Sequence, residues 1–197
     1  MPDYQEQLKN LQAMASVLPG RHGFHNGMRD NQNAVELEYG QMLYGAIQDR
    51  RPTHVVELGT AAGYSASWIL LGLEKNESGH LWTVDVSIPQ PPVWEQIGLP
   101  TERLTFMNEM VQDAIEQLPK TIDILFHDAS HDFNDIKKDF EALQSRIPKG
   151  GIFMVHDVNF RREMGDLVAK MFDEMPDVWN YQEISMGCGM GIAKRLT

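Results

Sequence analysis

HVVELGTAAGY, residues 54–64, has the pattern of a strand that turns directly into a helix. The run HVVEL (54–58) is short, apolar and β-branched, as expected of a buried parallel strand. Gly59 and Gly63 then permit a tight turn and a close approach of a ligand to the backbone. Helical spacing follows from about Tyr64 to Leu73. A strand, a glycine turn and a helix in this order predict an α/β fold.

The same alternation continues along the chain. Further strands are predicted at LWTVDV (81–86), LTFM (104–107), IDILFHD (122–128) and IFMVHD (152–157), with helical patterns between them. Alternating strands and helices imply a mainly parallel sheet with helices on both faces.

The chain ends in two strand-like runs, WNYQEIS (179–185) and GIAKR (191–195). Only MGCGM separates them, which is too short for a parallel crossover, so they should form an antiparallel hairpin. We therefore expect a Rossmann-like, seven-stranded, mainly parallel sheet with helices on both faces and a C-terminal antiparallel hairpin.

The 197 residues read as a single domain. Residues 1–50 are expected to form N-terminal helices and a lid loop, and residues 51–197 the Rossmann-like core. The loop would lie near LPGRHGFHNGMRDN (18–31), where His22 and His25 are interpreted as surface residues rather than catalytic ones.

Composition limits the class of protein. The net charge is −11, a surface that repels nucleic acid and anionic membranes. The N-terminus shows no secretory signal pattern, and no apolar run approaches the length of a membrane span. The one cysteine, Cys188, excludes an internal disulfide and fits a reducing compartment. We expect a cytoplasmic protein with a small-molecule partner, no nucleic acid and no membrane, and leave open a homodimer.

Acidic residues stand at or near the carboxyl ends of four predicted parallel strands, and these residues are Glu57, Asp85, Asp128 and Asp157. Ligands of open α/β sheets bind at this edge. Asp85 follows Gly63 by 22 residues (85 − 63), about the spacing at which an acid reaches ribose hydroxyls. The pattern indicates a nucleoside site, although turn glycines and a strand-end aspartate without a ligand would give the same letters.

The turn also discriminates between nucleosides. NAD favours Gly-x-Gly-x-x-Gly, whereas Gly59 and Gly63 form Gly-x-x-x-Gly. Glu57 would repel a pyrophosphate. S-adenosylmethionine (SAM) carries a sulfonium and an ammonium, which suit acidic surroundings, and its carboxylate can use a helix N-terminus.

The stretch VVELGTAAGYSASWILLGL (55–73) resembles the first motif of SAM-dependent O-methyltransferases related to catechol and caffeoyl-CoA O-methyltransferases. LTFMNEMVQDAIEQLP (104–119) and the segment 122–158 are similar to the same superfamily. The Asp-x-x-His pattern of Asp128 and His131 resembles a bacterial branch that includes sugar O-methyltransferases of antibiotic tailoring.

The resemblance implies roles for individual residues. Asp85 would hold the ribose. The methionine half would be bordered by Glu57, Gly59, Gly63 and Ser65, with Thr60 also counted as cofactor-binding. The adenine would be lined by Met110, Val111 and Gln112.

Asp128 and Asp157 match the metal-binding acids of the family, with magnesium or calcium expected from oxygen ligands. The third ligand stays open, because this chain has His156-Asp157-Val158-Asn159 where the relatives have Asp-Asn or Glu-Asp. On a regular strand, His156 should point away from Asp157, so it is interpreted as a structural histidine. Whether Asn159 takes part is open as well.

His131 is the candidate general base, with a contact to the helix start at Asp132–Asp135 as the alternative. Asp128 completes the catalytic pair as a metal ligand. Cys188 is interpreted as a packing residue, since no base is paired with it in sequence. The sequence predicts a SAM-dependent, metal-assisted O-methyltransferase, with a catalytically silent SAM-binding module or an NAD-dependent oxidoreductase as alternatives.

Overall fold

The computed structural model describes residues 4–14, 35, 37–88 and 91–197. Its helices are α1 (Tyr4–Met14), α2 (Leu37–Arg50), α3 (Tyr64–Asn76), α4 (Val93–Gln96), α5 (Val111–Ala114), α6 (Phe133–Leu143) and α7 (Arg162–Asp173), with a 3-10 turn η1 (Gln144–Arg146). Its strands are β1 (His54–Leu58), β2 (His80–Asp85), β3 (Leu104–Asn108), β4 (Ile124–His127), β5 (Ile152–His156), β6 (Trp179–Ile184) and β7 (Met190–Arg195).

The strands form one seven-stranded sheet in the order β3-β2-β1-β4-β5-β7-β6. β1 lies between β2 and β4, and Val55 is paired with Leu81 on one side and Ile124 on the other, both in parallel register. β7 runs antiparallel to β5 and β6. This arrangement confirms the expected mainly parallel sheet with its C-terminal hairpin.

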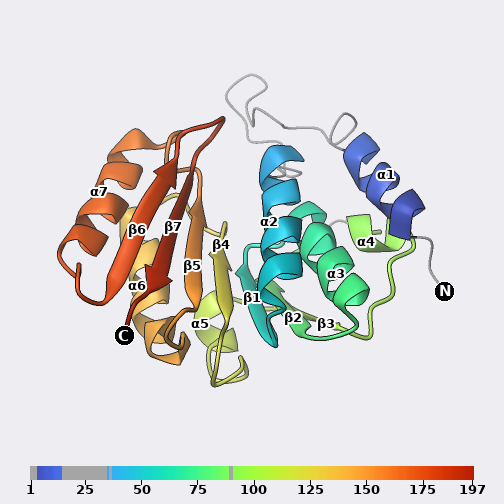
Figure 1. The fold of residues 1–197 in the computed structure, drawn as a ribbon, viewed down its shortest axis with the longest axis horizontal. Coiled ribbons are helices and arrows are strands. Elements are labelled where there is room, and N and C mark those ends of the chain that lie inside the picture. The colour runs from blue at the N-terminus through green and yellow to red at the C-terminus, as the bar shows by residue number, and fades with distance from the viewer. Residues whose placement is uncertain (1–3, 15–34, 36, 89–90) are drawn as a thin grey trace.

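Helices cover both faces of this sheet, α1 to α4 on one side and α5 to α7 on the other (Figure 1). Each face has its own apolar core. Leu43, Trp68 and Phe126 belong to the first core, and Phe140 and Phe153 belong to the second. Side chains of a strand alternate between the two faces of the sheet. Because helices cover both faces, the parallel strands carry mostly apolar side chains on both faces, as the sequence showed.

The element boundaries differ from expectation in a few places. The helical pattern after β3 extends to Leu118, but α5 is a single turn that ends at Ala114. The Pro-rich segment is not wholly irregular, because it contains the short helix α4. The predicted lid loop, with His22 and His25, lies outside the described residues.

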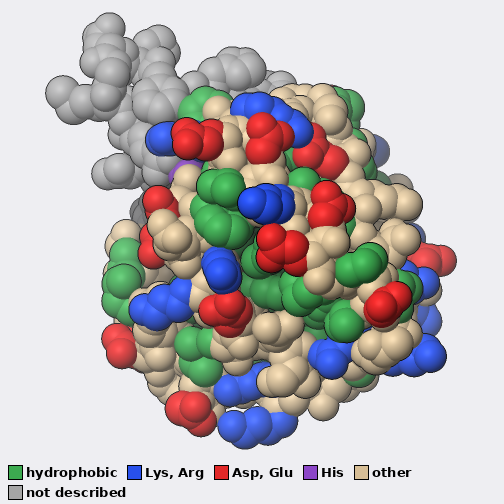
Figure 2. Space-filling view, turned by 90° about the vertical axis from the view of Figure 1, so that its left-hand side faces the viewer, with side chains coloured by type: hydrophobic (Ala, Val, Ile, Leu, Met, Phe, Trp, Pro, Cys, Tyr) green, Lys and Arg blue, Asp and Glu red, His purple; other side chains and the backbone are tan. Residues whose placement is uncertain are grey.

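The surface around α7 carries both signs of charge. Figure 2 faces this side of the molecule and shows Lys and Arg side chains interspersed with Asp and Glu. Within the described residues, none of the helices combines the length and the apolar character needed to cross a membrane.

Candidate functional site

A cavity of about 810 Å³ opens at the carboxyl ends of β1 to β4. Its size is in the range of small-molecule and cofactor sites. Seven of the predicted site residues line it, and these are Gly59, Asp85, Met110, Val111, Gln112, Asp128 and His131. The cavity therefore lies at the edge of the sheet where the strand pattern predicted a ligand site.

The turn after β1 is held in a conformation that requires glycine. Gly59 has φ of +93°, and a Cβ there would lie 2.4 Å from the backbone oxygen of Asp128. Asp85 braces the same turn, because its Oδ2 accepts hydrogen bonds from the backbone N–H groups of Thr60 and Ala61, each at 2.9 Å. Asp85 thus joins the end of β2 to the turn and lines the cavity beside it.

Four of the predicted cofactor residues do not line the cavity: Glu57, Thr60, Gly63 and Ser65. Glu57 is fully buried, and its Oε2 accepts a hydrogen bond from the Thr83 hydroxyl, which also pairs with the Thr60 hydroxyl at 2.6 Å.

Burial raises the pKa of Glu57 to about 8, against the lowering effect of the Ser65 and Thr83 hydroxyls. The carboxylates of Asp128 and Asp85 raise it further. At neutral pH this group is therefore mostly protonated in the ligand-free protein.

A cluster of carboxylates and imidazoles lies at the carboxyl ends of β4 and β5, and two of its members, Asp128 and His131, line the cavity. Asp128, His131 and Asp157 each offer one ligand atom, and these atoms lie within 4.8 Å of one another. His131 Nε2 pairs directly with Asp157 Oδ2. His156 Nδ1 lies 3.3 Å from Asp128 Oδ1 and 3.4 Å from Asp157 Oδ1.

The expected orientation of His156 was wrong. A strand that continued through Asp157 would turn the two side chains apart, but β5 ends at His156 and Asp157 has φ of +67°. This left-handed residue breaks the alternation of the strand, so both side chains face Asp128. Non-glycine residues with positive φ cost energy and tend to be found at functional sites.

The interactions of Asp157 favour its charged form. Burial alone would raise the pKa of this carboxyl, but hydrogen bonding to His131, the charges of His156 and His131, and a hydrogen bond from the Cys188 thiol together lower it. Cys188 therefore contacts the carboxylate cluster and is more than the packing residue that the sequence indicated.

The contacts of His131 that the structure shows are with residues other than those of the helix start. Helix α6 is capped by Asp132, whose side chain accepts a hydrogen bond from Asn134 N–H. The ring of His131 instead contacts Asp157 and lies edge-on to Phe160, with centroids 6.4 Å apart.

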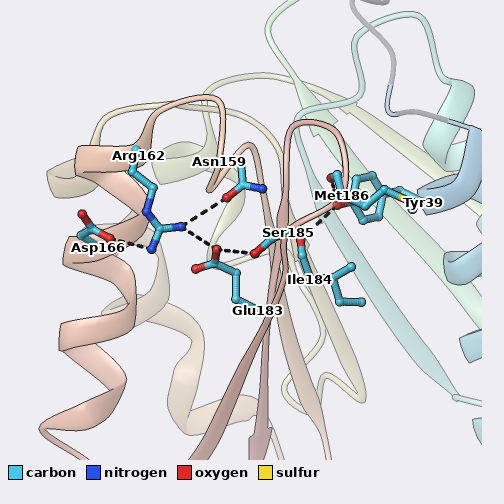
Figure 3. A network of polar contacts seen from close by, with 8 residues as sticks. All are labelled: Tyr39, Asn159, Arg162, Asp166, Glu183, Ile184, Ser185 and Met186. Carbon is cyan, nitrogen blue, oxygen red and sulfur yellow. Dashed lines mark hydrogen bonds and ion pairs between the residues drawn. The ribbon is translucent and has the colours of Figure 1, made fainter.

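A polar network fixes the loop that carries Asp157 (Figure 3). Arg162 donates to Asn159 Oδ1 at 3.2 Å and to Glu183 Oε1 at 2.6 Å, which ties the start of α7 to β6. Tyr39 of α2 donates to the backbone oxygens of Ile184 and Met186. The two loops beside the cluster are thus braced from both faces of the sheet.

A second buried network at the cavity wall was missed from the sequence. Asp139 of α6 is 3 % exposed and lines the cavity. Its Oδ1 accepts a hydrogen bond from Gln112 Nε2, and its Oδ2 lies 3.2 Å from Nε2 of the fully buried His127. One signal was available, since Asp139 stands at helical spacing from Ile136 and Leu143, on the apolar face of its helix.

Comparison with solved structures shows the same fold in several methyltransferases. The O-methyltransferase from Bacillus cereus, in complex with SAH, is 19% identical with a TM-score of 0.70, and covers 96% of this chain and 90% of its own. TomG from Streptomyces achromogenes, an O-methyltransferase involved in tomaymycin synthesis and solved with SAM, is 20% identical with a TM-score of 0.72, covering 98% and 90%. The O-methyltransferase NovP is 13% identical with a TM-score of 0.76, covering 99% and 100%.

No curated protein sequence gives a significant match to this chain. A family model described as a methyltransferase domain matches residues 56–158, more than half of the chain. The matched segment runs from β1 through the turn after β5 and includes both Asp85 and the carboxylate cluster. The protein therefore belongs to the methyltransferase-domain family.

Proposed function

We propose that this protein transfers the methyl group of SAM to a hydroxyl oxygen of a small molecule, with the help of a divalent cation. One observation carries the proposal: a single cavity joins the turn braced by Asp85 to the cluster of Asp128 and His131. A cofactor bound along the first part would therefore end at the second.

The cofactor half of the cavity suits a nucleoside. Asp85 lines the wall next to the glycine turn, where a carboxylate can accept bonds from ribose hydroxyls while it braces Thr60 and Ala61. The SAM-bound and SAH-bound structures with the same fold support SAM as the ligand. Glu57 lies beneath the turn, where its ionisation would favour the positively charged cofactor.

The donors of the cluster fit a divalent cation. Among the described residues, the ion-pair partners of Asp128 and Asp157 are histidines, so no lysine or arginine in these pairs neutralises the two carboxylates. A cation bound between these carboxylates would orient the acceptor hydroxyl and lower its pKa. Magnesium and calcium suit the carboxylates, whereas a ligating imidazole from His156 would shift the preference toward manganese or zinc.

His131 is positioned to receive the proton. With Nε2–H donating to Asp157, the neutral ring carries its lone pair on Nδ1, and the Asp157 carboxylate stabilises the imidazolium that forms. The acceptor oxygen attacks the methyl carbon, the carbon–sulfur bond breaks with its electrons passing to sulfur, and the acceptor proton passes to His131. The products are the methyl ether and S-adenosylhomocysteine (SAH).

A small-molecule acceptor is supported by the net charge of −11, which opposes nucleic acid and anionic membranes. The apolar ring of Phe160, 41 % exposed beside His131, offers a surface for the carbon skeleton of the acceptor. A cytoplasmic location and a homodimer are part of the same proposal.

The test is SAH formation from SAM in the presence of a panel of hydroxylated small molecules, with and without a chelator. We expect acceptor-dependent SAH formation that chelation abolishes, while calorimetry shows SAM binding unchanged. Full activity in excess chelator would refute the role of the cation. SAM binding without turnover on any acceptor would favour a catalytically silent module.

A further inference from the structure

We infer that Asp139 is a positioning residue that makes Gln112 a selective acceptor for the 6-amino group of adenine. The inference rests on the proposed function, because it assumes that a purine nucleoside occupies the cavity. It adds a residue that recognises nothing itself and acts through the orientation of its neighbour.

The orientation follows from the chemistry of the two side chains. A carboxylate can only accept hydrogen bonds, whereas the Gln112 amide has one accepting end and one donating end. Because Asp139 Oδ1 lies 3.2 Å from Gln112 Nε2, the amino end of the amide is committed to the carboxylate. The carbonyl Oε1 is then the end of Gln112 that remains for a ligand.

His127 fixes Asp139 in turn. Its ring is fully buried in β4, and its Nε2 lies 3.2 Å from Asp139 Oδ2. Its Nδ1 has no hydrogen-bond partner among the described residues. Since a buried N–H without a partner is costlier than a lone pair without one, the proton belongs on Nε2, where it is donated to Asp139. Asp139 therefore receives one donor on each oxygen.

The position of the purine follows from the cavity wall. Val86 and Met110 are 58 % and 54 % exposed, although both are apolar, and both line the cavity beyond Asp85. A flat base joined to a ribose at Asp85 can cover these side chains and bring its edge to Gln112. Adenine presents an amino group at position 6, which donates to Oε1. Hypoxanthine presents an oxygen there, and two acceptors would face each other.

The experiment compares the calorimetric dissociation constants of SAH and S-inosylhomocysteine, whose purines differ in the group at position 6 and in the proton that the inosyl ligand carries on N1. The unaltered protein should prefer SAH by roughly ten- to a hundredfold, the cost of an unpaired acceptor. In Asp139→Asn the new amide can offer either end, Gln112 can turn over, and the ratio should fall below about threefold. Gln112→Met, at an exposed position that does not threaten folding, should lose the preference as well.

Asp135→Asn is the matched control, because Asp135 lines the same cavity from the same helix but bonds Ser130 instead. It should keep the full preference. A purely structural loss in Asp139→Asn would weaken both ligands equally and leave the ratio unchanged, which would overturn the inference. Equal binding of both ligands to the unaltered protein, or a preference for the inosyl ligand through the nearby Lys138, would overturn it as well. If neither ligand binds the unaltered protein, the proposed function itself fails.

Discussion

Glu57 and Asp157 are two buried carboxyl groups on the same edge of one sheet, and they have opposite pKa shifts. Glu57 lies within β1, contacts hydroxyl groups, and has its pKa raised to about 8 by burial. Asp157 follows β5, contacts His131 and His156, and has its pKa lowered although it is nearly as deeply buried.

The two pKa shifts differ in direction because the side chains that contact the carboxyl groups differ, and not because one group is buried more deeply. Hydroxyl groups do not offset the cost of burying a charge, whereas imidazoles that can carry a positive charge do. The two carboxyl groups therefore differ in charge. Glu57 is mostly neutral beneath the turn, whereas Asp157 is ionised and can help to hold a cation or to stabilise a protonated histidine.

The largest expected effect comes from removing a negative charge from the pair of carboxylates Asp128 and Asp157. Asp157→Asn and Asp128→Asn should each abolish methyl transfer and cation binding, because a neutral amide replaces one of the two charged carboxylates that would hold a hard cation. Calorimetry with manganese, alongside SAH formation, measures both losses. Asp166→Asn is the control, since Asp166 pairs with Arg162 on the exposed side of α7 and should leave both quantities unchanged. Cation binding that survives in Asp157→Asn would contradict the assignment.

Variants of the two histidines in the cluster distinguish the general base from a cation ligand. His131→Gln should lower the rate by roughly 10²–10⁴-fold, the contribution of a general base, with cation affinity retained. His156→Gln should lower cation affinity if the imidazole is the third ligand. Rates measured across pH, together with manganese affinity for both variants, decide the matter. Unaltered turnover and pH profile in His131→Gln would show that His131 is not the base.

At the cofactor end, Asp85→Ala should weaken SAM binding by tenfold or more. Each charge-assisted hydrogen bond is worth roughly 1.5–3 kcal/mol, and this variant also frees the N–H groups of Thr60 and Ala61 that Asp85 holds. Calorimetric titration with SAM measures the loss. Unchanged affinity would remove Asp85 from the site, while a lower melting temperature alone would limit it to bracing the turn.

The smallest effect concerns the stability of the ligand-free protein. Because the folded pKa of Glu57, about 8, exceeds its ordinary 4.5, the folded state keeps a proton that the unfolded chain releases between these values. The stability contributed by this group is complete below pH 4.5 and is lost as the pH rises toward 8.

Glu57→Gln resembles the protonated form and should not show that loss. The difference in free energy of unfolding between variant and unaltered protein should therefore grow with pH, by at most about 1.4 kcal/mol per pH unit. Denaturant unfolding at several pH values between 5 and 8 measures it. Parallel stability curves would mean that Glu57 is ionised throughout.

The sequence predicted those features of the fold that depend on the pattern of neighbouring residues. The apolar runs, the short MGCGM connection and the glycine turn were sufficient for the sheet and its hairpin. The positive φ at Asp157 and the contact of Cys188 with its carboxylate were not predictable, because both depend on the loop after β5 meeting the hairpin. The pairing of Asp139 with His127 likewise requires α6 to be packed on β4. Glu57 and Ser65 are buried and do not line the cavity, and this could not be predicted because it depends on how the turn packs in the folded sheet.

The most direct test of the account is an anomalous difference map from crystals grown with SAH and manganese chloride. We expect one manganese peak between Asp128 and Asp157, with the SAH ribose on Asp85 and its sulfur directed toward that peak. A nucleoside bound elsewhere, or a cavity containing SAH with no manganese at the two carboxylates, would contradict it.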